Sequence, residues 1–175
     1  KYVMDAGTAQ LFVVLVEHDG APALALVRRE QLADGAISSH TLIDQTKRAA
    51  NIDFSGISLA DADLICGETV ATALGDVLLL GALLTAAEAT GSAAACLDTV
   101  VEYLKTRKQF GRLIGSYQAL KHPTVEMLTA MDSARSLLYH AATIVTDETL
   151  GKDAEIACRM AKAQATEALL FAGDR

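Results

Sequence analysis

The sequence predicts an α+β protein in which an antiparallel, β-barrel-like sheet domain precedes a long-helix antiparallel bundle. Residues 1–66 contain short runs rich in Val, Leu, Ile and Phe that are separated by turn residues, which is typical of antiparallel strands. After Gly67 the apolar residues recur with helical spacing, and Ala and Leu, which favour helix, become abundant. We therefore predict a β-domain over residues 1–66 and an α-helical bundle domain over residues 67–175. Both look partial, because each end of the chain cuts into a regular pattern.

The candidate strands of the β-domain are short apolar runs with turn signals between them. They comprise residues 11–16, 23–27 and 50–54, with a weaker strand start within residues 35–39. The turns fall at Asp19-Gly20, Asp34-Gly35 and Ser55-Gly56. An Asp-Gly pair between two apolar runs favours a two-residue hairpin, so Asp19-Gly20 is the strongest local prediction in this half.

Three long helices are predicted in the second half. The first runs from about Thr69 to Phe110, a stretch without proline whose residues 97, 100, 101 and 104 share one face. Ser116 is the predicted N-cap of the second helix, and Pro123 falls in its early turns. The apolar stripe of that helix comprises Met127, Met131, Ala134, Leu138, Ala141 and Val145. The third helix is predicted over residues 153–172, and short connections suggest antiparallel neighbours.

Composition excludes several classes of protein. A net charge of −7 and a pI near 5.0 argue against a nucleic-acid surface. The longest apolar run lies between Asp76 and Glu88, which is too short to span a bilayer, so we predict a buried core helix there and no membrane partner. The three cysteines are far apart, and neither they nor the histidines have metal-ligand spacing. We expect no metal site, and a cytoplasmic protein with reduced thiols.

The segment from Tyr103 to His122 is the most informative part of the chain. It spans the predicted end of the first helix, a glycine-bounded turn and the start of the second helix, and it carries Arg107, Phe110 and Gln118. A guanidinium can bind phosphate oxygens, an aromatic ring can stack on a flat ligand, and an amide can hydrogen-bond to the edge of a heterocycle. Spacing alone favours plainer roles: a cation capping a helix C-terminus, a ring plugging the turn, and a surface amide.

The same segment closely resembles a signature of the acyl-CoA dehydrogenase family. The pattern Y-x-x-x-R-x-x-F-G-x-x-I-x-x-x-Q starts at Tyr103 and ends at Gln118. The resemblance extends over essentially the whole chain, because residues 1–7 are similar to the family's middle β-domain and residues 57–67 to the link into its C-terminal helical domain. Without the resemblance, the alternative is a helical-bundle interaction protein with a small β appendage.

The resemblance implies an FAD-dependent enzyme that removes the α and β hydrogens of an acyl-CoA thioester, in fatty acid or steroid degradation. A carboxylate takes the α proton in that reaction, and the flavin accepts the β hydride. Arg107 and Gln118 would bind the pyrophosphate and adenine side of FAD across a subunit interface, with Phe110 packing near the cofactor. The implied partners are an acyl-CoA substrate, further subunits of a homo- or hetero-oligomeric dimer or tetramer, and electron-transfer flavoprotein as a candidate electron acceptor.

No catalytic residue is assigned in this chain. Gly81 stands where some family members carry the base, so we expect the base beyond Arg175, and Glu88 reads as a solvated or interface charge. Leu79 and Ala82 occupy the places of an acid and an arginine that usually face the acyl-CoA. Two hypotheses follow: the substrate carries a bulky apolar acyl group, such as a sterol-derived one, or the chain is a catalytically degenerate partner subunit that helps bind FAD in a heteromeric enzyme.

Overall fold

The computed structural model describes residues 2–146 and 153–174 and confirms the α+β class. The chain divides into two compact units, Lys1–Leu74 and Gly75–Arg175. The first unit holds the sheets, and the second holds most of the three long helices. The predicted boundary between residues 66 and 67 stays a prediction for the domains of the complete protein.

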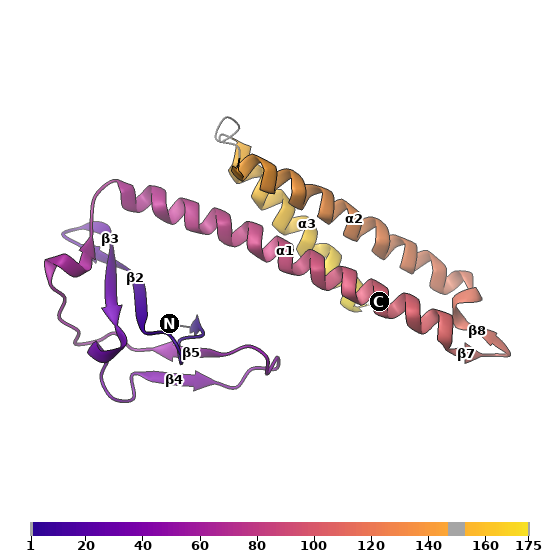
Figure 1. Ribbon diagram of the computed structural model, residues 1–175, viewed down its shortest axis with the longest axis horizontal. Coiled ribbons are helices and arrows are strands. Elements are labelled where there is room, and N and C mark those ends of the chain that lie inside the picture. Colours follow the sequence, from indigo (N-terminus) through magenta and orange to yellow (C-terminus); the bar gives the residue numbers. More distant parts are fainter. Residues whose placement is uncertain (1, 147–152, 175) are drawn as a thin grey trace. The chain divides into compact units, whose positions relative to one another are not determined.

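The first unit contains two three-stranded antiparallel sheets (Figure 1). One sheet has the order β1-β5-β4, formed by Tyr2–Met4, Ala49–Ile52 and Ile37–His40. The other has the order β2-β3-β6, formed by Leu11–His18, Ala21–Arg28 and Leu64–Ile65. Both contribute side chains to one apolar core, which includes Phe12, Val27 and Ile52. The predicted strands at residues 11–16, 23–27 and 50–54 are thus confirmed.

The Asp19-Gly20 turn connects β2 and β3 as predicted. The strands pair from Leu11 opposite Arg28 to His18 opposite Ala21, which leaves two residues for the loop. Asp19 has φ 52° and Gly20 has φ 77°, the two left-handed conformations of a type I′ turn. Two short 3₁₀ helices, η1 (Arg29–Gln31) and η2 (Asp61–Asp63), lie after β3 and before β6.

The helices of the second unit run side by side in antiparallel order (Figure 1). They are α1 (Thr69–Thr106), α2 (Gln118–Thr146) and α3 (Ala154–Asp174). The predicted stripe of α2 forms the core, in which Met127 and Met131 contact Leu97 of α1 and Ala172 of α3. The buried face of α3 consists mainly of alanine: Ala154, Ala157, Ala161, Ala165, Ala168 and Ala172. Such small side chains let neighbouring helices approach closely.

The prediction that the apolar run of α1 is buried is wrong within this chain. Leu79 and Leu83 pack against the helical core, but Leu78 is 74% exposed, and Val77 and Leu84 are exposed as well. By length and composition alone α1 is long and apolar enough to cross a membrane, and the core helix of a soluble protein can be equally long and apolar. The run carries apolar side chains on all sides, and packing against α2 and α3 covers only one of them.

The prediction of Ser116 as the N-cap of α2 is also wrong. Ser116 belongs to a separate 3₁₀ turn, η3 (Ile114–Ser116), and its Oγ donates a hydrogen bond to the Leu113 carbonyl oxygen at 2.7 Å. Helix α2 begins two residues later, at Gln118. The hydroxyl is therefore used within the turn and does not cap the helix.

Candidate functional site

The turn predicted between the first two helices is a small β-hairpin at one end of the bundle (Figure 1). After α1 ends at Thr106, β7 (Lys108–Gln109) pairs with β8 (Arg112–Leu113). Phe110 and Gly111 form the two-residue loop, with φ 52° and 79°. These values are nearly those of Asp19-Gly20, so the tip is a second type I′ turn. Residues 107–118 are called the FG hairpin.

Backbone contacts fix the base of the FG hairpin against the end of α1. The Ile114 N–H donates a hydrogen bond to the Arg107 carbonyl oxygen at 2.9 Å. Gly115 lies so close to the last turn of α1 that a Cβ there would stand 2.8 Å from the Leu104 carbonyl oxygen. Because that neighbour is backbone, no larger residue fits without moving the chain. The close approach explains the glycine at this position.

Tyr117 holds the rest of the hairpin. Its hydroxyl donates a hydrogen bond to the Gln109 carbonyl oxygen at 3.3 Å. The Arg112 Cζ lies 3.9 Å above the centre of its ring, a cation–π geometry. The Phe110 ring meets it edge-on, with centroids 6.4 Å apart and planes at 90°. Sequence reasoning assigned no role to Tyr117 or Arg112, and the aromatic residue just before Gln118 was the signal that could have marked them.

The cations at positions 105, 107 and 112 differ in their partners. The Lys105 ammonium pairs with Glu102 at 3.0 Å, and the Arg112 guanidinium lies over Tyr117. Arg107, the first residue after α1, is exposed, and its guanidinium has no hydrogen-bond or ion-pair partner within residues 2–146 and 153–174. Its place at a helix C-terminus is as predicted, and the guanidinium's donors are available to an anion.

The interpretation of Phe110 as a plug beneath the turn is wrong. Its side chain is 92% exposed, and its backbone is left-handed, a conformation that bulky residues rarely adopt. Gln118 is the first residue of α2 and is exposed too. Arg107, Phe110 and Gln118 therefore lie on one hairpin with their side chains directed outward. In the described part of the chain, none of the three bonds to another.

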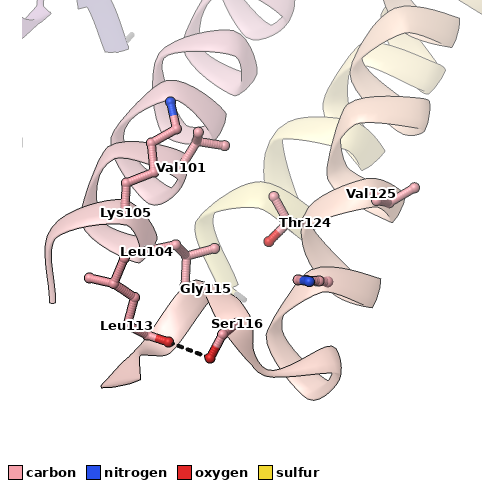
Figure 2. A pocket seen from close by; sticks show the side chains of 9 residues that line it. Val101, Leu104, Lys105, Leu113, Gly115, Ser116, Thr124 and Val125 are labelled. Atoms are coloured by element: carbon pink, nitrogen blue, oxygen red, sulfur yellow. Dashed lines mark hydrogen bonds between the residues drawn. The ribbon is translucent and has the colours of Figure 1, made fainter. Parts of the chain in front are cut away.

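An apolar groove of about 490 Å³ lies beside the hairpin, between the end of α1 and the start of α2 (Figure 2). Apolar side chains make most of its wall, and Lys105, Lys121, Ser116 and Thr124 add polar atoms. The apolar members are Val101, Leu104, Leu113 and Val125. The sequence did not predict this groove, because it depends on how the hairpin folds back beside α1.

The expected substrate side of α1 carries no acid or arginine. Leu79 and Ala82 are partly buried and pack against the core shared with α2 and α3. Gly81 is exposed, and its carbonyl oxygen accepts a hydrogen bond from the Thr85 hydroxyl at 2.7 Å. Glu88 is an exposed residue of the same helix. The residues at positions 79, 81 and 82 thus supply no carboxylate and no arginine.

Comparisons with known proteins agree with this architecture. The family described as "Acyl-CoA dehydrogenase, C-terminal domain" matches residues 71–175. The acyl-CoA dehydrogenase IpdE2 of Mycolicibacterium smegmatis is 48% identical over 81 residues, which cover 45% of this chain and 25% of that protein. The chain belongs to the acyl-CoA dehydrogenase family.

The fold is shared with solved structures, among them two complexes. The glutaryl-coenzyme A dehydrogenase–glutaryl-CoA complex matches with a TM-score of 0.85 and 21% identity, over 99% of this chain and 45% of that one. The ChsE4–ChsE5 complex from Mycobacterium tuberculosis matches with a TM-score of 0.70 and 22% identity, over 99% of this chain and 48% of that one. The chain thus spans about half the length of these solved relatives.

Proposed function

We propose that this chain is part of a subunit of an FAD-dependent acyl-CoA dehydrogenase that acts on an acyl-CoA thioester, and that its FG hairpin binds FAD at a subunit interface. The observation that carries the proposal is the exposed, left-handed Phe110 beside an unpartnered Arg107. Within its own chain the Phe110 side chain gains only the edge contact with Tyr117, although its backbone is held in an uncommon conformation and its ring is not buried. Such a residue is better explained by a contact with a ligand or with another subunit.

The residues of the hairpin fit the groups of FAD. The Arg107 guanidinium would hold the pyrophosphate through its forked N–H donors, and the Gln118 amide would bind on the adenine side. Phe110 would pack near the cofactor. These three side chains point outward, which suits a cofactor bound mainly by a neighbouring subunit. When bound, FAD supplies the acceptor for the β hydride.

A second candidate is favoured by the sequence of α1. Without a carboxylate at Gly81, and with Leu79 and Ala82 packed into the core, this chain lacks the usual substrate-side groups of that helix. It would then be a catalytically degenerate subunit that helps its partner bind FAD. The fold shared with a chain of the ChsE4–ChsE5 complex supports a heteromeric assembly. In the first candidate, the same apolar helix suits a bulky apolar acyl group, such as a sterol-derived one.

Two measurements on the purified complete protein test these candidates. Bound flavin in the visible absorption spectrum is expected for both, and its absence after reconstitution with FAD would contradict both. Dehydrogenation of acyl-CoA thioesters is then assayed with this subunit alone and with its co-purified partner, using electron-transfer flavoprotein as the electron acceptor. Activity of the subunit alone supports the catalytic candidate, whereas activity that requires the partner supports the degenerate one.

A further inference from the structure

The FG hairpin requires support that its own strands do not provide. Its strands have two residues each, and an isolated two-stranded hairpin is marginally stable at best in water. Phe110 adds strain, because its φ of 52° lies in the left-handed region. A fixed position for the exposed ring therefore depends on contacts from outside the hairpin strands.

Tyr117 provides a contact to each part of the hairpin. It bonds to β7 through the Gln109 carbonyl oxygen, touches the turn through the Phe110 ring, and receives Arg112 of β8 on its face. A cation over an aromatic ring and a perpendicular pair of rings are both favourable, because each ring has an electron-rich face and an electron-poor edge. One side chain thus links both strands and the turn.

The backbone of Tyr117 also joins the hairpin to α2. Its carbonyl oxygen accepts hydrogen bonds from the N–H groups of Leu120 at 3.1 Å and Lys121 at 3.2 Å, in the first turn of the helix. Its own N–H donates to the Ile114 carbonyl oxygen at 3.1 Å. Gln118 is the next residue in the chain, so the placement of Tyr117 sets the start of α2 as well as the hairpin tip.

We propose that Tyr117 is a positioning residue for the FAD site, which acts on the cofactor through Phe110 and does not touch it. This inference rests on the proposed function of the FG hairpin. The inference also gives the two arginines of the hairpin different roles. Arg107 is free to bind the pyrophosphate, whereas Arg112 is held on the Tyr117 ring and fixes the position of that ring.

The test measures the FAD dissociation constant of the reconstituted complete protein. Tyr117→Phe keeps both ring contacts and is expected to stay within about threefold of the wild type, whereas Tyr117→Leu removes them and should weaken binding about tenfold. Arg112→Gln should weaken binding only about two- to fivefold, because it removes the cation–π contact alone. Thermal unfolding of each apoprotein identifies any variant that is broadly misfolded.

A double-mutant cycle separates positioning from general stabilisation. In a Phe110→Leu background, Tyr117→Leu should add less than about twofold to the FAD dissociation constant, because the ring through which it acts is gone. Full additivity of the two substitutions would overturn the inference. So would a loss of FAD in Arg112→Gln as large as that in Arg107→Ala, because Arg112 would then itself be a ligand.

The Arg107→Ala variant distinguishes failure of this inference from failure of the proposed function. If Arg107→Ala and Phe110→Leu both bind FAD like the wild type, the hairpin is not an FAD site and both proposals fail. If Arg107→Ala loses FAD but Tyr117→Leu binds it normally, only the positioning role is refuted.

Discussion

Replacing Phe110 by Asn should leave the apoprotein about as stable as before, or more stable, while weakening FAD binding. The left-handed conformation at φ 52° costs a bulky residue roughly 1–2 kcal/mol, and Asn tolerates it much better. The edge contact with Tyr117 contributes about 0.5–1.5 kcal/mol and is lost. Because the ring is 92% exposed, almost no burial is lost with it. The difference between these two contributions predicts a free energy of unfolding that lies between about 0.5 kcal/mol lower and about 1.5 kcal/mol higher than in the wild type.

The same substitution should weaken FAD binding. A Phe ring that becomes buried against a ligand contributes about 1.5–3 kcal/mol, so we expect the FAD dissociation constant of Phe110→Asn to rise at least tenfold. Denaturant unfolding of the apoprotein gives the stability, and titration of flavin fluorescence gives the affinity. Asp19→Asn is the matched control, because Asp19 has the same φ in the other type I′ turn. It should change neither quantity appreciably.

Two results would refute this reasoning. A loss of more than about 1 kcal/mol in the apoprotein would mean that Phe110 is a structural plug after all. An unchanged FAD affinity would mean that the exposed ring is not kept for the cofactor. A ring retained for function requires weaker FAD binding without a loss of apoprotein stability of that size.

Three further predictions concern the fold. Gly115→Ala brings a methyl carbon to 2.8 Å from the Leu104 carbonyl oxygen, so the unfolding free energy should fall by about 1–3 kcal/mol, whereas Gly91→Ala, with open space around it, should not destabilise. Burial raises the pKa of the Cys158 thiol, so a thiol reagent should label it only upon unfolding. Ser55 lowers the pKa of Asp53, chiefly through a hydrogen bond from its hydroxyl and less strongly through one from its backbone N–H. The ionised Asp53 therefore stabilises the folded state fully above the unfolded pKa of about 3.9, and this stabilisation is lost as the pH falls through the lower folded pKa. In acid titrations, the difference in unfolding free energy between the wild type and Asp53→Asn should shrink accordingly.

Sequence patterns predicted the long elements well because each has a repeated signal. The period of apolar residues located α1, α2 and α3, and Asp19-Gly20 located the β2–β3 hairpin. The FG hairpin was seen only as a turn, since strands of two residues have no period and Phe-Gly is not a preferred pair for a type I′ loop. The apolar run of α1 was predicted to be buried because it is apolar and too short to span a bilayer, but composition does not show which of its faces this chain covers.

The residues of the candidate site could be predicted only in part from the sequence. Resemblance to the family, and not spacing, singled out Arg107, Phe110 and Gln118. Spacing favoured Phe110 as a plug, because the positive φ that turns the ring outward cannot be seen in a sequence. The contacts of Tyr117 were missed for a related reason: they join residues of the hairpin whose proximity follows from its fold.

The most direct test of the central claim is the FAD dissociation constant of Arg107→Ala. Loss of a charge-assisted hydrogen bond costs about 1.5–3 kcal/mol, so the constant should rise roughly 10- to 100-fold. Arg135→Ala is the control, because Arg135 pairs with Asp132 on α2 and belongs to no part of the hairpin. It should bind FAD like the wild type. Equal FAD affinity in the two variants would contradict the assignment of the FG hairpin as an FAD site.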